Sequence, residues 1–257
     1  MSTFRVLQFN MQFGQVWSAA DPDNAPVDLD ATLAEIKRHR ADLILLQEVE
    51  RAQTGGVQTE PPPNYTRLCA GLEGYDSWFS YPKADSRELP FGIGLAIFSR
   101  TPLSDRMRVD LPSPPIEFGF RGRTTTPTDR VLIGAKTTLL GREVQLFNTH
   151  LLAFFMLGTT STEHPAQRNL VAELLASSPG PTILSGDFNV TEHESLVAQF
   201  AGLGYATVQQ DEVTWRRRAY VLDHVFYNAP LRRVSHTVMP TPTSDHHALV
   251  ADFEFHG

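Results

Sequence analysis

Polar residues of the kinds that bind metal ions or transfer protons stand at the ends of apolar runs. Glu48 follows the run 42–46, and the segment Gly-Asp-Phe-Asn at 186–189 follows another run. Asn10 and His150 close two more. Side chains at strand ends are held by a rigid sheet and still reach a common edge, where α/β proteins usually build their sites. We therefore expect these positions to meet in one site.

Two further motifs lie nearer the C-terminus. Asp223-His224 stands in the otherwise apolar segment 221–227, and Ser244-Asp245-His246-His247 precedes the last apolar run. A carboxylate in an apolar strand normally has a dedicated partner, often a histidine or a metal ion. Each motif alone also has a plainer interpretation, such as a turn residue at Asn10 or an Asx turn at 187–189. Their joint occurrence favours a site.

The combined set is rich in oxygen donors. It comprises four carboxylates, two carboxamides and two imidazoles, namely Glu48, Asp187, Asp223, Asp245, Asn10, Asn189, His150 and His246. Such sets suit Mg²⁺, or alternatively Mn²⁺, because these ions prefer hard ligands. The sequence has neither a thiolate cluster typical of structural zinc nor a glycine-rich phosphate loop followed by Lys-Ser/Thr. The pattern predicts a site for a divalent cation.

Short apolar strands alternate with amphipathic helices along the chain. The periodicity predicts a helix around 29–37, capped by Asp28 or Asp30, and a second around 170–175 that ends before Pro179-Gly180-Pro181. Segments 53–64 and 111–128 are rich in Pro and Gly and are interpreted as surface loops. Strands are expected at 5–10, 42–48, 94–99, 144–148, 182–185, 221–226 and 247–253. This alternation indicates an α/β protein with at least one sheet covered by helices.

Composition is typical of a globular protein, since 41% of the 257 residues are hydrophobic. The net charge of −7 argues against a protein that coats nucleic acid by bulk electrostatics. The single cysteine, Cys69, cannot form an intramolecular disulfide. The first residues show no basic leader, and no apolar stretch is long enough to span a bilayer. We expect a soluble cytoplasmic protein with one domain over residues 1–257.

The motifs, taken in order, resemble those of the endonuclease/exonuclease/phosphatase superfamily. This group includes deoxyribonuclease-like, apurinic endonuclease-like and neutral sphingomyelinase-like metal-dependent hydrolases. The resemblance implies a four-layer α/β/β/α sandwich of two packed mixed β-sheets flanked by helices, and a divalent-metal-dependent phosphoric ester hydrolase, foremost a phosphodiesterase. The matching residues span almost the whole chain and are Asn10, Gln47-Glu48, Asn148-Thr149-His150-Leu151, Gly186-Asp187-Phe188-Asn189, Asp223-His224 and Ser244-Asp245-His246.

The resemblance also implies a metal shell. Glu48 matches the principal metal ligand, with Asn10 beside it and Asp245 near or in the shell. The cofactor implied is Mg²⁺, with Mn²⁺ as the alternative.

The remaining residues match catalytic roles. Asp187 matches the residue that orients or deprotonates the attacking water, helped by Asn189. Asp223 and His246 match a carboxylate–imidazole pair, and His150 matches a donor to a phosphate oxygen. Whether Asp187 or His246 is the general base stays open.

The substrate class stays open between nucleic acid, lipid and small phosphate esters. Arginines at 121–130 and 216–218 are candidates for gripping phosphate, although solvated turns are the commoner use. The apolar segment 151–158 suits either a lipid-facing wall or core packing. The net charge weakens a DNA-repair interpretation, and a secreted sphingomyelinase would carry a signal peptide. A non-catalytic binding module and the oligomeric state also stay open.

Overall fold

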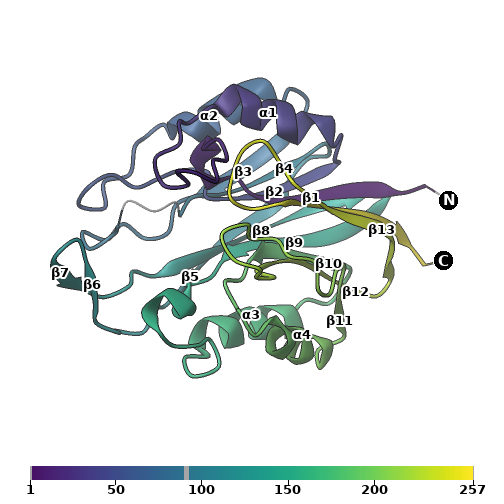
Figure 1. Ribbon diagram of the computed structural model, residues 1–257. Helices are drawn as coiled ribbons and strands as arrows, with labels where there is room; N and C mark the ends of the chain where they lie inside the picture. The colour runs from purple at the N-terminus through teal and green to yellow at the C-terminus, as the bar shows by residue number, and fades with distance from the viewer. Residues whose placement is uncertain (1, 90–92, 257) are drawn as a thin grey trace.

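Two mixed β-sheets pack face to face with helices on their outer faces (Figure 1). The computed structural model describes residues 2–89 and 93–256. Helices α1 and α2 cover one sheet, α3 and α4 cover the other, and each sheet has six strands. The predicted four-layer α/β/β/α sandwich is confirmed. No helix within the described residues is long and apolar enough to cross a membrane.

The sheets have similar layouts. The first has the order β13-β14-β1-β2-β4-β3, and the second has the order β11-β12-β10-β9-β8-β5. The helices are α1 (Leu29–Arg38), α2 (Pro63–Gly71), α3 (Ala166–Ala176) and α4 (His193–Ala201), with 3₁₀ turns η1 (Gln12–Gly14) and η2 (Phe154–Leu157). The strands are β1 (Phe4–Asn10), β2 (Leu43–Gln47), β3 (Asp76–Ser80), β4 (Leu95–Ser99), β5 (Ser104–Leu111), β6 (Phe118–Phe120), β7 (Arg123–Thr125), β8 (Arg130–Leu139), β9 (Arg142–His150), β10 (Thr182–Asp187), β11 (Tyr205–Thr207), β12 (Asp223–Asn228), β13 (Leu231–Met239) and β14 (Ala248–Phe255).

Each sheet contains one parallel pair of strands, and these pairs decide where the polar strand ends lie. β1 pairs in parallel with β2 so that Asn10 stands beside Gln47, and β9 pairs in parallel with β10 so that His150 stands beside Asp187. β12 runs antiparallel to β10 and begins with Asp223 opposite Asp187. β14 likewise runs antiparallel to β1, so the loop before it returns to the same edge. The topology therefore gathers the motifs at one edge of the sandwich.

Three apolar clusters hold the layers together. The inner faces of the sheets share a core that includes Val6, Leu45, Ile133 and Ile183, all fully buried. A second cluster joins the first sheet to α1 and α2, and a third joins the second sheet to α3 and α4. Burial of apolar surface on both faces explains why the central strands are nearly continuous runs of apolar residues rather than alternating ones.

Most of the elements expected from the sequence are present. The first helix begins after Asp28, whose side chain accepts a hydrogen bond from the backbone N–H of Ala31 (2.9 Å). Three expectations need correction. The segment 111–128 is not wholly loop, because β6 and β7 form a hairpin in it, and the segment 53–64 ends inside α2. The strand expected from residue 221 begins only at Asp223.

Another pair of histidines joins the first residue of α4, His193, to His224 of β12, which follows Asp223. His224 is fully buried, its Nδ1 lies 3.0 Å from Thr207 Oγ1, and its ring lies 5.4 Å from that of His193. Burial, reinforced by His193, lowers the pKa of His224 to about 3. The folded protein therefore holds this imidazole neutral.

We expect His224→Asn to reduce the loss of stability in acid. The pKa of His224 is lower in the folded than in the unfolded chain, so its contribution is lost as the pH falls from 6.5 towards about 3. One such group contributes up to about 1.4 kcal/mol per pH unit over that window. Urea denaturation at pH 7 and pH 4.5 measures the difference between variant and wild type. Equal pH dependence in the two proteins would contradict this.

Candidate active site

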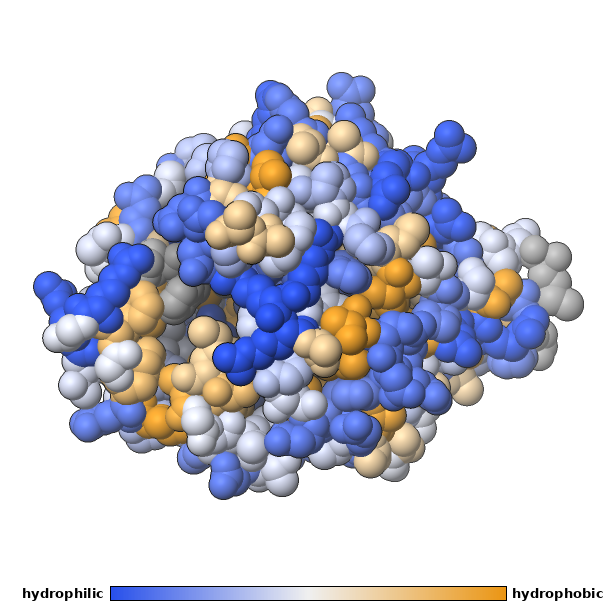
Figure 2. Space-filling view, viewed as in Figure 1, coloured by the Kyte–Doolittle hydropathy of each residue, from blue (hydrophilic) through white to orange (hydrophobic). Residues whose placement is uncertain are grey.

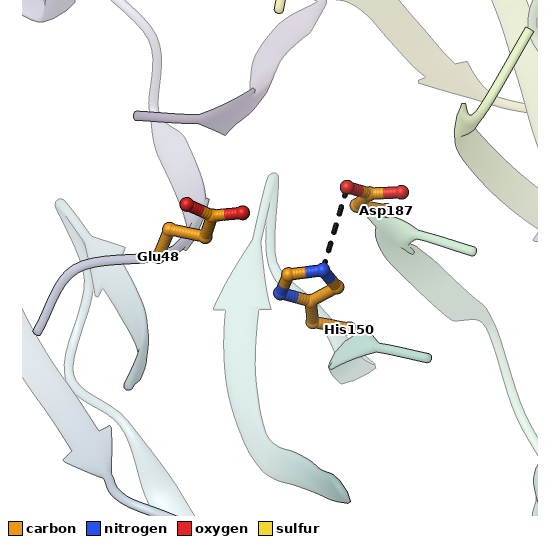
Figure 3. Close-up of side chains that lie close together, drawn as sticks. All are labelled: Glu48, His150 and Asp187. Atoms are coloured by element: carbon orange, nitrogen blue, oxygen red, sulfur yellow. Dashed lines mark ion pairs between the residues drawn. The ribbon is translucent and has the colours of Figure 1, made fainter. Parts of the chain in front are cut away.

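Three side chains of kinds that can bind a metal ion meet where β2, β9 and β10 end (Figure 3). One ligand atom from each of Glu48, His150 and Asp187 lies within 4.8 Å of those of the other two. His150 Nε2 lies 3.5 Å from Asp187 Oδ2. A second such group, of Asp187, Asp223 and His246, shares the same aspartate. The sequence-predicted residues of both sheets are thus brought together.

Asn10 joins the acidic side chains of the two sheets. Its Nδ2 donates to Glu48 Oε1 at 3.1 Å and to Asp187 Oδ2 at 3.0 Å. The amide oxygen accepts from the backbone N–H of Gln12 at 3.1 Å. In this arrangement Asn10 presents its donor, rather than its oxygen, to the two carboxylates.

His246 forms a pair with Asp223 in the interior. His246 Nδ1 lies 2.7 Å from Asp223 Oδ2, while Gln8 Nε2 donates to Asp223 Oδ1 at 2.8 Å. Burial alone would lower the pKa of His246, but the charges of Asp223 and Asp187 outweigh it and raise that pKa to about 10. His246 is therefore an imidazolium ion at neutral pH, with Nε2 3.6 Å from Asp187 Oδ2.

The carboxyl groups of the cluster resist ionisation. Burial, reinforced by the charge of Asp223, raises the pKa of Asp187 to about 8. Burial, reinforced by Asp245, raises the pKa of Glu48 to about 7. Acids crowded in this way favour a cation among them, because it relieves both the desolvation and the mutual repulsion. The oxygen-rich donor set fits a divalent ion.

His150 differs from His246 in charge. Burial, followed by the nearby charges of Arg130 and His246, lowers the pKa of His150 well below its usual range. Its Nδ1 is buried and has no hydrogen-bond partner within the described part of the chain. His150 is therefore a neutral imidazole with one ring nitrogen free for a ligand.

Left-handed backbone turns aim several of these side chains. Glu48 has a φ of 50°, Asn189 has a φ of 52°, and Ser244, next to Asp245, has a φ of 68°. Non-glycine residues adopt this region at a cost, and such residues gather at functional sites. Gly186 meets a different constraint, since a Cβ there would lie 2.4 Å from the carbonyl oxygen of Thr149. Close packing of β10 on β9 thus requires glycine just before Asp187.

Asp245 is held by a loop that sequence analysis interpreted differently. Its Oδ2 accepts from Trp215 Nε1 at 3.1 Å and from Arg217 Nε, and Arg217 also contacts Asp23. Arg216 donates to the carbonyl oxygen of Thr241 and lies over the ring of Trp17. Two of the three arginines at 216–218, which were candidates for gripping phosphate, are therefore bonded within the protein.

Asn189 and the apolar segment 151–158 make mostly structural contacts. The backbone N–H of Asn189 donates to Asp187 Oδ1, and its side-chain Nδ2 donates to the carbonyl oxygen of Leu151, both at 3.0 Å. Phe154 is buried, whereas the ring of Phe155 lies 5.6 Å from that of Trp215. Core packing thus accounts for Leu151, Leu152 and Phe154, whereas Met156 is 68% exposed and Phe155 extends an aromatic surface beside Asp245.

Several residues that support the site are not recognisable in that role from the sequence. Gln8 looked like an ordinary polar residue in β1, yet it is fully buried and binds Asp223. Trp215 and Arg217 lie eight and six positions before Asp223, in a loop whose path the sequence does not reveal. A buried polar residue in an apolar strand, as at Gln8, is the one signal that could have been followed.

The chain belongs to the Endonuclease/Exonuclease/phosphatase family, whose family model matches residues 7–246. An UPF0294 protein of Yersinia pseudotuberculosis is 32% identical over 121 residues, which span 44% of each chain. The chain thus aligns with less than half the length of this curated relative.

Solved structures share the fold over the whole chain. An endonuclease/exonuclease/phosphatase from Beutenbergia cavernae has a TM-score of 0.72 at 20% identity, over 100% of this chain and 72% of that one. The catalytic domain of human Nocturnin with bound sulfate anion has a TM-score of 0.63 at 22% identity, over 99% and 94% of the two chains.

We expect Arg217→Met to destabilise the protein by about 1–3 kcal/mol, because it leaves the buried Asp245 carboxylate short of a charged donor. Arg218→Met, at an exposed neighbour, should change stability by less than about 0.5 kcal/mol. Urea denaturation in EDTA measures both. Equal effects of the two substitutions would show that the contact with Asp245 contributes nothing.

Proposed function

We propose that the protein is a divalent-metal-dependent phosphodiesterase that works as one catalytic domain. The observation that carries this proposal is the buried group of Glu48, His150 and Asp187 beside the Asp223–His246 pair. An oxygen-rich acidic cluster and an imidazolium at the same edge suit hydrolysis of an anionic ester. The family membership supports the same chemistry.

Glu48 is the proposed principal ligand of Mg²⁺, and Asp245 and the oxygen of Asn10 complete the protein's share of the shell. When bound, the ion supplies positive charge that offsets the charge developing on the phosphate oxygens. For Asn10 this role requires its amide to turn, because its nitrogen now faces the carboxylates. Mn²⁺ satisfies the same ligand preference.

Asp187 is the proposed general base. A base is most effective when its pKa is close to the working pH, and the pKa of Asp187 is raised to about 8. The ring of His246 is already protonated and so serves as a donor to a phosphate oxygen rather than as a base. Asp223 fixes the orientation of that ring and Asn189 holds the turn that carries Asp187. His150 is the proposed second donor to phosphate.

Asp187→Asn and His246→Ala should each lower metal-dependent turnover by at least about 10²-fold, because each removes a charge-handling group from the reacting centre. His256→Ala, at an exposed position, is the matched control for the histidine. The assay compares Mg²⁺ with EDTA on supercoiled plasmid, sphingomyelin vesicles, a chromogenic diester and a chromogenic monoester. Turnover that persists in EDTA or in Asp187→Asn would refute the proposed mechanism.

Metal affinity should rise with pH. Below pH 7 the Glu48 and Asp187 carboxyls hold protons that a cation must displace, and these protons are released as the pH rises through about 7 and about 8. We expect Mn²⁺ to bind at least about tenfold more tightly at pH 8.5 than at pH 6.5. Calorimetry in two buffers of different ionisation enthalpy measures the affinity and the proton release.

A matched pair of variants isolates the cluster in that titration. Glu48→Gln should weaken binding and flatten its pH dependence. Glu50→Gln should change neither, although burial also raises the pKa of Glu50 to about 7, because Glu50 instead accepts from the backbone N–H of Tyr65. If the affinity of wild type for Mn²⁺ did not change with pH, the cation would not be displacing protons from these carboxyl groups, and the prediction would be wrong.

Nucleic acid is the substrate class that one observation favours. Phe155, Trp215 and Tyr220 are half-buried and contact one another, with ring centroids 5.6–5.9 Å apart, next to Asp245 and His246. Exposed aromatic faces stack on nucleobases without regard to sequence. Figure 2 shows hydrophilic and apolar residues interspersed over the face of the molecule seen in Figure 1. Plasmid cleavage faster than that of the small diester would support this class.

A further inference from the structure

Arg130 presents a cation beside the candidate active site, and two of its guanidinium nitrogens have no hydrogen-bond partner among the described residues, although its charge also acts on the buried Glu88. Its Nε and Nη1 are buried and have no hydrogen-bond partner in residues 2–89 and 93–256. Within the same residues, no carboxylate lies within ion-pair distance of its guanidinium. Arg216 and Arg217, which lie near Asp245, instead donate to protein oxygens.

The place of Arg130 in the sheet explains its closeness to the site. It is the first residue of β8, and Val131, which follows it, pairs with His150 at the end of β9. The charge of Arg130 acts on both Glu48 and His150, lowering the pKa of each. Arg130 therefore stands beside the acidic cluster and one of its imidazoles without being bonded to either.

A buried guanidinium without acceptors is costly, so its retention points to a ligand. Leaving a buried donor unpaired forfeits its hydration, more so when the group is charged. Arg cannot release its proton, and its planar fork matches two oxygens of a phosphate group. His150 Nδ1 is a third buried nitrogen without a partner among the described residues. Three unpaired nitrogens beside an acidic cluster suit an anionic group that also contacts a bound cation.

We propose that Arg130 binds the non-bridging oxygens of the scissile phosphate group, with the neutral His150 beside it. This inference rests on the proposed function, since it assigns a substrate-binding residue to the same site. When phosphate is bound, charge-assisted hydrogen bonds to its oxygens replace the hydrogen bonds to water that the guanidinium loses on burial. Arg130 then positions the ester between the acidic cluster and the imidazoles.

The test measures binding of inorganic phosphate, so that it does not depend on turnover. Calorimetry with Mn²⁺ present compares wild type, Arg130→Met, Arg130→Lys and Arg123→Met, the last at an exposed position on β7. Arg130→Met should bind phosphate about 10- to 100-fold more weakly than wild type. Arg130→Lys should lose less, because it keeps the charge and loses the fork. Arg123→Met should bind as wild type does.

Affinity for Mn²⁺ alone separates an effect on phosphate from damage to the metal cluster. It should be unchanged in Arg130→Lys, which keeps the charge that acts on Glu48, and should change less than phosphate affinity in Arg130→Met. Circular dichroism checks folding, and Arg130→Lys carries the test if Arg130→Met does not fold. Phosphate binding as in wild type by the folded Arg130 variants would overturn the inference, as would failure of wild type to bind phosphate. Wild type that binds phosphate through Arg130 but hydrolyses no ester would refute only the proposed function.

Discussion

A chain of buried side-chain hydrogen bonds ties the two sheets together at the edge where the site lies. Gln8 Nε2 donates to Gln47 Oε1 at 2.8 Å, and Gln47 Nε2 donates to Asn148 Oδ1 at 2.6 Å across the sandwich. Asn148 in turn donates to the carbonyl oxygens of Leu46 and Ala96. Buried amides are costly when unpaired, and among these three side chains only Gln8 Oε1 lacks a partner within the described residues. The bonds between Gln47 and Asn148 therefore favour one mutual position of the two sheets.

That fixed position makes the acidic cluster possible. Glu48 comes from the first sheet and Asp187 from the second, and Asn10 bridges them through a single amide nitrogen. Neither sheet alone holds the complete group of ligands. Burial between the sheets and the charges of neighbouring carboxylates raise the pKa of both acids. The acidic cluster therefore depends on how the two sheets are packed against each other.

The sequence was sufficient to predict the layered fold and the meeting of the polar strand ends. Parallel strands carry their carboxyl ends to one edge, so Asn10, Glu48, His150 and Asp187 could be grouped before any contact was known. The first helix could be located from its period and from Asp28. What local pattern does not contain is the path of irregular segments. The β6–β7 hairpin lay in a stretch dominated by Pro and Gly, and the 213–218 loop approaches Asp245 from a part of the chain with no periodicity.

The charge states of the site histidines also could not be predicted from the sequence. His150 and His246 are both histidines at strand or loop ends, yet one is neutral and the other is an imidazolium, because only His246 has the Asp223 carboxylate at 2.7 Å. Arg217 and Arg130 similarly have opposite surroundings, one paired with carboxylates and one without a partner among the described residues. Residue type gives the capacity for chemistry, while burial and partners decide how it is used.

The central claim is that the edge shared by the two sheets is built around a divalent cation. Diffraction from crystals grown with Mn²⁺, recorded at the manganese absorption edge, tests it most directly. The account predicts an anomalous peak about 2 Å from a carboxylate oxygen of Glu48. A peak confined to surface carboxylates, with none at Glu48, would contradict it.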